Sequence, residues 1–156
     1  MTKVYRILRR IYAKKPLDGE GSFRFGGRWS SPGTRVAYLA EHLSLAMIEY
    51  FVHIDPESLP KDLVLVTAQV PDTISRSSIS PKRLPANWRS NPAPPSLANI
   101  GDTFVREART AILMVPSALA PAESNWLINP AHPHAAKITV QAAQKFRYDP
   151  RFFNES

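Results

Sequence analysis

A run of aliphatic and β-branched residues, Leu63–Val70, dominates the middle of the chain, and Pro71 and Asp72 end it. Runs of this length and composition, closed by turn-forming residues, predict a buried β-strand. Shorter segments of the same kind recur and predict further strands: Lys3–Leu8, Val36–Leu39, Ala111–Val115 and Trp126–Ile128. A closing extended stretch covers Ile138–Tyr148. Because strands outnumber helical patterns and the two kinds are mixed, the expected fold class is α+β.

The remaining segments predict two helices and two irregular stretches. One helix is expected over Glu41–His53, and a shorter one over Gly101–Arg109 with Asp102 as its N-cap. The glycines and proline of Gly19–Gly33 favour a loop. The many Pro, Ser and Asn residues of Asp72–Asn99 favour a long surface excursion.

Length and composition indicate one ordinary globular domain over residues 1–156, with 44% hydrophobic and 21% charged residues. The absence of cysteine excludes disulfides, thiolate zinc sites and a cysteine nucleophile. No apolar run approaches the roughly 20 residues that span a bilayer, and no signal peptide is recognisable, so a cytoplasmic protein without a membrane partner is expected. The histidines form no helical metal-binding pair, and no Asp/Glu cluster joins them, so no metal is predicted.

The formal net charge of +7 suits a nucleic acid, an anionic small molecule or an acidic protein partner. Nucleic-acid readers usually concentrate their basic residues in one helix or loop, whereas most of those here are scattered, as on a solvated surface. Arg24, Arg28 and Arg35 are the exception, because they cluster in or beside the glycine-rich stretch, which also carries aromatic residues. Loops of this composition often bind a ligand.

The predicted helix over Glu41–His53 is apolar on most of its circumference. Only a narrow strip, with His42, Glu49 and His53, is polar. Such a helix is expected to be largely buried, and Glu49 then faces a cleft or needs a partner, because an unpaired buried carboxylate is costly. The alternative is that this strip is simply the edge of the helix that faces solvent.

Two residues upstream of this helix have side chains that suit a nucleotide. Arg28 offers a permanently charged planar fork for phosphate, Tyr38 offers a ring for stacking, and Glu49 can accept hydrogen bonds from a sugar hydroxyl. Because the three come from successive segments, they are expected to converge at one edge of a sheet. Taken singly, Tyr38 is equally suited to the core, Arg28 to the surface and Gly26-Gly27 to a plain turn.

Several short motifs follow one another along the chain: Tyr5-Arg6, Gly26-Gly27-Arg28-Trp29-Ser30, Val36-Ala37-Tyr38-Leu39-Ala40-Glu41 after Gly33, Leu45-Ala46 to Glu49, Gly101-Asp102, Val115-Pro116-Ser117 and Asn125-Trp126-Leu127-Ile128-Asn129-Pro130-Ala131-His132-Pro133. In this order and spacing they resemble the RES domain family, from Tyr5 to about Phe152. That family is named for an Arg, a Glu and a Ser, which correspond here to Arg28, Glu49 and Ser117. Ser124 is a second candidate for the serine, but Ser117 is preferred because it ends a predicted buried strand.

The resemblance implies a fold akin to ADP-ribosyltransferase toxins, with a mixed, mainly antiparallel β-sheet core and a few short helices. It implies a toxin that consumes NAD as its substrate, with no permanently bound cofactor and no direct binding of nucleic acid. It also implies a cognate Xre-type antitoxin, whose chain includes a helix-turn-helix region and which occludes the active site. A toxin dimer within that complex is compatible with the resemblance.

The resemblance and the chemistry of the nicotinamide–ribose bond together suggest a role for each residue. Cleavage passes through an oxocarbenium-like state, so Glu49 would stabilise the positive charge on the sugar and hold the ribose 2′-hydroxyl. Tyr38 would stack on nicotinamide, Arg28 would bind the pyrophosphate, and Ser117 would organise the pocket by hydrogen bonds. Further NAD contacts are expected from Arg6, Trp29 and Asn129. The attacking group, whether water, inorganic phosphate or a protein side chain, stays open.

Two other functions fit the same sequence. A protein ADP-ribosyltransferase would use the same residues and differ only in the acceptor. A basic nucleic-acid-binding module or ribonuclease toxin would rely on the positive charge, with His132 and His134 as an acid–base pair. Those histidines lie in a proline-flanked turn, where a structural or solvent-exposed role is more common.

Overall fold

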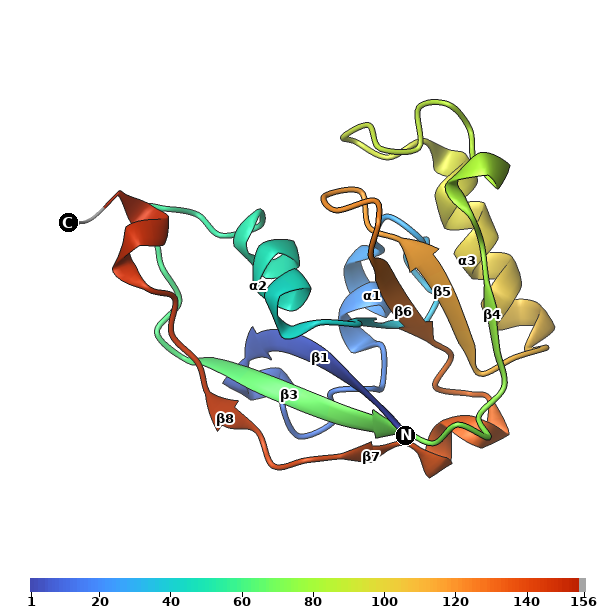
Figure 1. The fold of residues 1–156 in the computed structure, drawn as a ribbon, viewed down its shortest axis with the longest axis horizontal. Coiled ribbons are helices and arrows are strands. Elements are labelled where there is room, and N and C mark those ends of the chain that lie inside the picture. The colour runs from blue at the N-terminus through green and yellow to red at the C-terminus, as the bar shows by residue number, and fades with distance from the viewer. Residues whose placement is uncertain (155–156) are drawn as a thin grey trace.

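The computed structural model describes residues 1–154, and its strands all belong to one curved sheet (Figure 1). The strand order is β4-β5-β6-β2-β1-β3-β7, and β8 also pairs with β3. Every pair is antiparallel except β4 with β5. The strands are β1 (Thr2–Arg9), β2 (Ala37–Ala40), β3 (Leu63–Val70), β4 (Arg76–Ser78), β5 (Ile112–Pro116), β6 (Ser124–Ile128), β7 (Thr139–Val140) and β8 (Gln144–Lys145). The predicted α+β class with a mainly antiparallel sheet is confirmed.

The register of the central strands decides which side chains share a face of the sheet. Tyr38 pairs with Leu127 and Ala40 with Asn125, and side chains alternate between the faces along each strand, so these four lie on one face. Helices α2 (Leu43–Phe51) and α3 (Pro95–Glu107) both pack on this face. The opposite face holds a separate apolar core, which includes Val4, Leu39, Ala68, Ile112, Trp126 and Ile128.

Helix α2 is shorter and more exposed than its sequence predicts. It covers Leu43–Phe51, and only Leu45 and Ala46 in it are buried. The apolar residues on its outer side are Leu43, Ile48 and Val52, which are 38%, 41% and 52% exposed. The expectation of a largely buried helix is therefore wrong. The sheet covers one side of α2 and the C-terminal segment Phe146–Phe153 packs beside it, but the outer side stays open to solvent.

Two other segments contain more helix than predicted. The Gly19–Gly33 loop contains helix α1 (Glu20–Phe25), which Gly19 begins at a φ of 71° that favours glycine. Helix α3 begins at Pro95, in the first turn where proline fits well, and not at Gly101. Asp102 therefore lies inside α3 and is not its N-cap. Its carboxylate accepts a hydrogen bond from the backbone N–H of Ser31 at 2.9 Å.

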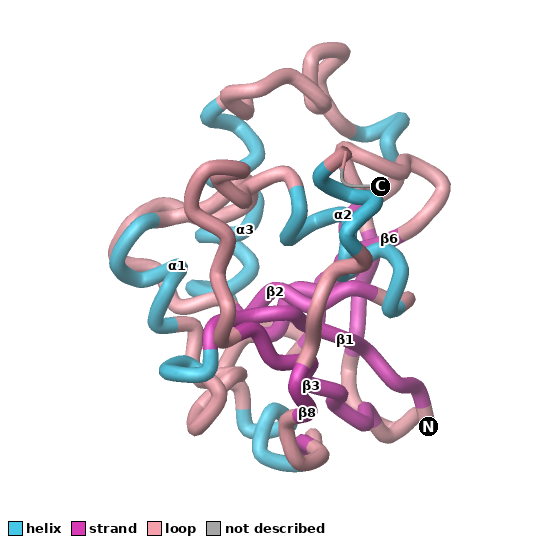
Figure 2. The backbone as a smooth tube through the Cα atoms, turned by 90° about the vertical axis from the view of Figure 1, so that its left-hand side faces the viewer, coloured by secondary structure: helices cyan, strands magenta, loops and turns pink. Residues whose placement is uncertain are grey.

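The C-terminal stretch returns along the sheet and ends beside α2. Ile138–Tyr148, predicted to be extended, forms the short strands β7 and β8 at the edge of the sheet. The Tyr148 hydroxyl then donates to the backbone carbonyl of Met47 at 2.5 Å. Figure 1 and Figure 2 show the last helical turn, Pro150–Phe153, beside α2, and in Figure 1 α1 lies on the opposite side of that helix. None of the helices in residues 1–154 has the length and apolar composition of a membrane span.

Candidate active site

The carboxylate of Glu49, on α2, is held by two side chains from neighbouring parts of the sheet. The Ser117 hydroxyl donates to Glu49 Oε1 at 2.7 Å, and the Asn125 amide donates to the same oxygen at 2.9 Å. Neither bond uses the second oxygen, Oε2. Glu49 thus has the partners that a partly buried carboxylate needs, and one oxygen is left for another group.

Ser117 directly follows β5 and is fully buried. Its Oγ accepts hydrogen bonds from the backbone N–H groups of Leu119 and Ala120, each at 3.1 Å. Because both of these partners are donors, the single hydroxyl proton is free to go to Glu49. Ser124 instead uses its backbone N–H to donate to Glu41. Of the two serines considered for the family position, Ser117 is the one whose side chain bonds to Glu49.

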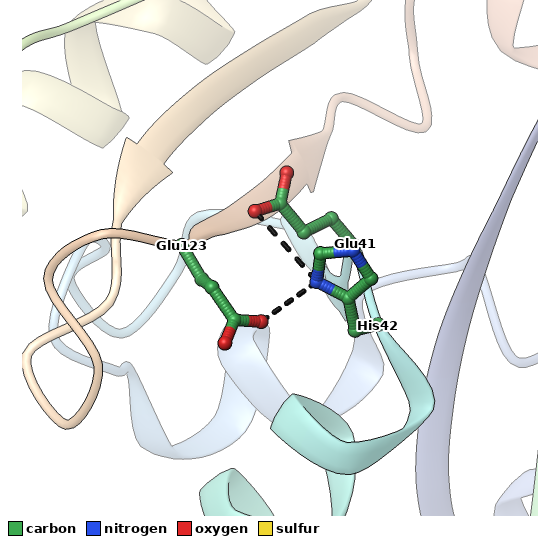
Figure 3. A group of neighbouring side chains, drawn as sticks. All are labelled: Glu41, His42 and Glu123. Atoms are coloured by element: carbon green, nitrogen blue, oxygen red, sulfur yellow. Dashed lines mark hydrogen bonds and ion pairs between the residues drawn. The ribbon is translucent and has the colours of Figure 1, made fainter.

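The start of α2 is tied to the connection between β5 and β6 by a cluster of charged side chains (Figure 3). His42 Nδ1 lies 2.7 Å from Glu123 Oε1 and 3.9 Å from Glu41 Oε1. Glu41 Oε1 also accepts the backbone N–H of Ser124 at 2.8 Å. These contacts fix the end of the connection that leads into Asn125.

The same cluster corrects one detail of the sequence analysis. Glu41, His42 and Glu123 offer ligand atoms that lie within 4.8 Å of one another, so an acidic pair does join a histidine. The pattern was missed because Glu123 is distant in sequence from the other two. All three ligand atoms already take part in the contacts within the protein described above, and the absence of a metal stays a prediction.

The Tyr38 hydroxyl is held beneath the glycine-rich loop by a chain of hydrogen bonds. It lies 2.6 Å from Ser30 Oγ, which lies 2.7 Å from Ser22 Oγ, and Ser22 donates to the carbonyl of Thr34. The proton of Ser22 is used by that carbonyl, so Ser30 must donate to Ser22 and Tyr38 to Ser30. Trp29 N–H donates back to the Tyr38 oxygen at 3.1 Å. The Tyr38 hydroxyl therefore uses its proton in the bond to Ser30 and its oxygen in the bond from Trp29. In this arrangement it is not available as a general base.

Burial raises the pKa of Tyr38 to about 12, and it outweighs the hydrogen bonds with Ser30 and Trp29, which act in the opposite direction. A folded-state pKa above the unfolded value of roughly 10 adds stability below that pH, and this stability is lost as the pH rises towards 12. Near neutral pH, Tyr38→Phe is expected to be less stable by about 1–2 kcal/mol, because Trp29 N–H loses its acceptor. The difference in free energy of unfolding between the wild type and Tyr38→Phe should become smaller above about pH 10.

Thermal unfolding followed by circular dichroism between about pH 7 and pH 11 measures that difference. Other buried tyrosines, such as Tyr148, titrate in both proteins, so they cancel in the difference. If the difference in stability between the wild type and Tyr38→Phe stayed constant over this pH range, the Tyr38 hydroxyl would not be buried as described.

Arg28 links the glycine-rich loop to the surface excursion between β4 and α3. Its Nη1 donates to the carbonyls of Trp88 at 3.1 Å and Ser90 at 2.9 Å. Neither bond uses Nε or Nη2. The loop itself is further held by α3, because Asp102 binds Ser31 N–H and the backbone of Gly101 lies directly against the carbonyl of Trp29. The Gly101-Asp102 motif thus has a structural role in positioning Arg28.

Glu49 and Tyr38 lie over the same face of the sheet, and the loop that carries Arg28 borders it. Tyr38 lies diagonally across from Asn125 on β2 and β6, a spacing at which long side chains still reach one another. Asn125 in turn binds Glu49, and the loop with Arg28 covers the Tyr38 hydroxyl. Asn125 was not predicted as a site residue, although it lies in the Asn125–Pro133 motif. The strand register reveals it, since it shares a face with Tyr38.

Three other predicted NAD contacts, Arg6, Trp29 and Asn129, have side chains engaged in contacts within the protein, and their part in binding NAD stays a prediction. Arg6 points to the other face of the sheet from its neighbour Tyr5, which pairs with Ala40. The Arg6 guanidinium donates to the Pro16 carbonyl at 2.6 Å, and burial lowers its pKa. The other two are buried as well: the Trp29 ring packs in the core, and Asn129 is fully enclosed.

Asn129 and the two nearby histidines serve the local backbone. Asn129 donates to the Val105 carbonyl at 3.3 Å and accepts Ala131 N–H at 3.0 Å. His132 Nδ1 accepts the backbone N–H of His134, and His134 Nδ1 accepts that of Ser75. These bonds stabilise turns, so the geometry does not favour His132 and His134 as the acid–base pair of a ribonuclease.

Surface hollows occur beside α3, lined by Phe104 and Leu113 among others, and beside α2, lined by Val52 and Phe152 among others. Neither is lined by Arg28, Tyr38 or Glu49. The shared face with its fixed carboxylate, and not either hollow, is therefore the candidate site. The expectation that the three groups surround a dinucleotide stays a prediction.

Comparison with known proteins gives the same family as the motifs. The family model of the RES domain matches residues 3–150. The Prs ADP-ribosylating toxin of Sphingobium sp. (strain YBL2) is 38% identical over 149 residues, which cover 94% of this chain and 92% of that protein. A protein named Toxin Res from Pseudomonas putida is also 38% identical over 149 residues, 94% of this chain and 99% of its own.

A solved structure shares the fold. A chain of the M. tuberculosis MbcT–MbcA toxin–antitoxin complex superposes with a TM-score of 0.76 at 17% identity, covering 98% of this chain and 87% of its own. The family match and the sequence relatives extend over nearly the whole length of this chain. The chain therefore belongs to the RES domain family.

Proposed function

We propose that this chain is the toxin of a bacterial toxin–antitoxin pair and that it removes NAD by cleaving the bond between nicotinamide and ribose. The observation that carries the proposal is the Glu49 carboxylate, whose Oε1 accepts two hydrogen bonds while Oε2 takes part in neither. A carboxylate fixed in this way stabilises the positive charge that develops on the ribose as the bond breaks. Relatives named as toxins, at 36–38% identity, support the same class.

Each of the three side chains has a part in this reaction. Oε2 of Glu49 accepts the ribose 2′-hydroxyl, and Tyr38 presents its ring to nicotinamide without moving a proton. Arg28 binds the pyrophosphate through Nε and Nη2, which its bonds to Trp88 and Ser90 leave unused. Nicotinamide leaves with the bonding electrons. Water then gives ADP-ribose and a proton, whereas inorganic phosphate gives phosphorylated ADP-ribose.

Transfer of ADP-ribose to a protein is the second candidate. The relative named Prs ADP-ribosylating toxin, at 38% identity, favours it. The same three residues would serve both reactions, since they act on the bond that breaks and leave the acceptor undefined. The two activities differ only in where the ADP-ribose is found afterwards.

Incubation of the purified chain with NAD labelled in its ADP-ribose half tests the proposal. Free nicotinamide with labelled ADP-ribose supports hydrolysis, and labelled ADP-ribose phosphate that forms only with added phosphate supports phosphorolysis. Label on protein, when a cell lysate is added, supports transfer. If no nicotinamide is released with any of the three acceptors, both proposed functions are wrong.

We further propose that the partner is an Xre-type antitoxin that covers this face, and a toxin dimer is compatible with such a complex. The structural neighbour from M. tuberculosis was solved as a toxin–antitoxin complex, which supports a protein partner of this kind. The net charge of +7 would favour both an acidic antitoxin surface and the anionic dinucleotide. Because NAD is an intracellular coenzyme, we expect the toxin to act in the cytoplasm.

A further inference from the structure

We infer that Asn125 is a positioning residue for the proposed reaction: it fixes the orientation of the Glu49 carboxylate so that Oε2 faces the ribose. This inference rests on the proposed function. Asn125 does not need to touch NAD to act in this way. It acts through the hydrogen bond from its amide nitrogen to Glu49 Oε1, at 2.9 Å.

A single donor does not fix a carboxylate, because the group can still turn about its last side-chain bond. The Ser117 hydroxyl supplies one donor to Oε1, from the end of β5. Asn125 supplies the second, from β6. Two donors from different segments on the same oxygen define the plane of the carboxylate, and they leave the other oxygen as the acceptor for a ligand.

Asn125 is itself held in place by strands on both sides. It pairs with Ala40 of β2 and with Val115 of β5, so it lies in the interior of the sheet and not at an edge. The preceding residue, Ser124, is tied through its backbone N–H to Glu41 at the start of α2. The strand that carries Asn125 and the helix that carries Glu49 are therefore linked at two points.

The chemistry of the amide suits this role. An asparagine nitrogen donates without carrying charge, so it orients the carboxylate and leaves most of its negative charge for the ribose. An aspartate would place a second carboxylate at the same distance and repel the first. Asparagine and aspartate have nearly the same shape, so comparing them separates the hydrogen bond from the packing.

The test is a double-mutant cycle on the full chain, with NAD consumption as the readout. Asn125→Ala is expected to lower kcat about 10–100-fold, the range for losing a hydrogen bond to a charged group, with KM changed less than about threefold. Asn125→Asp should be at least as impaired. In a Glu49→Ala background, Asn125→Ala should cost no more than about twofold, because its only target is gone. Equal losses in both backgrounds would overturn the inference.

A second readout does not depend on NAD. Thermal unfolding of the wild type, the two single alanine variants and the double variant should show coupling. Asn125→Ala is expected to lower Tm by about 2–4 °C in the wild type and by less in the Glu49→Ala background. Additive Tm changes would mean that the contact itself is absent. Coupled Tm changes in a wild-type chain that consumes no NAD would mean that the contact stands and the proposed function fails. Asn99→Ala, at an exposed position of α3, is the matched control and should keep full activity.

Discussion

Replacing Glu49 by glutamine is expected to lower NAD consumption by the purified chain about 10²–10³-fold, the range for losing one group that stabilises transition-state charge. The amide oxygen of glutamine can still accept from Ser117 and Asn125, so the side chain keeps its position. The negative charge is lost, and an NH2 group that cannot accept the ribose 2′-hydroxyl replaces Oε2. Tm should therefore stay within about 3 °C of the wild type. In cells, inducing the wild-type chain should deplete NAD, and inducing Glu49→Gln should not.

Glu57→Gln is the matched control, because Glu57 is an exposed carboxylate on the surface beyond α2. It carries the same change of charge and should leave NAD consumption unchanged. If Glu49→Gln retained wild-type activity while remaining folded, the charge of Glu49 would have no part in the reaction. Loss of activity together with a large fall in Tm would instead show that Glu49 is needed for folding.

Gly101→Ala is expected to have the largest effect on stability, about 3 kcal/mol or more, which corresponds to a fall in Tm of about 6–12 °C. A methyl group on Gly101 would overlap the carbonyl oxygen of Trp29. That oxygen belongs to the backbone and cannot rotate away, so α3 must separate from the glycine-rich loop. The bond between Asp102 and Ser31 N–H would be lost with it. Chemical or thermal denaturation measures the effect.

Gly21→Ala makes the same chemical change where no atom lies within 4 Å of the added group. Gly21 is inside α1, so alanine should leave Tm unchanged or raise it slightly through its better helix propensity. Equal effects at Gly21 and Gly101 would show that the close approach of α3 to Trp29 is not a tight contact.

Most strands were predictable because their signal is local, whereas β4 lies within the predicted surface excursion and was missed. Leu63–Val70 forms β3 with the predicted bounds, since a continuous apolar run between turn residues needs no knowledge of its neighbours. Helix α2 was predicted in type but not in burial. The apolar residues around α2 show how much surface this helix could bury. How much it does bury depends on the sheet and the C-terminal segment, which cover only part of it. The predicted start of helix α3 was six residues too late, because the prolines before and at its first position are typical of a loop.

The site was partly predictable for a different reason. The motifs predicted Glu49, Ser117 and Tyr38 as site residues, but they did not separate side chains that face the candidate site from those that only stabilise the fold. Trp29 and Asn129 share motifs with site residues and are buried in structural contacts. Asn125 is in the same motif as Asn129, but it lies within β6 and binds Glu49, whereas Asn129 follows the strand and binds the backbone of Val105 and Ala131. That distinction depends on which distant segment packs beside each residue, α2 for Asn125 and α3 for Asn129, and the motif carries no signal for it.

The bonds from Arg28 to the carbonyls of Trp88 and Ser90 hold a long connection in place, in addition to the ligand binding that we propose for this arginine. Arg28→Ala would therefore remove the support of this connection and the proposed ligand contact together, and its effect on activity could not be assigned to either one alone. Because these bonds already order the guanidinium in the free protein, binding an anion costs less side-chain entropy, and more of the electrostatic attraction contributes to affinity.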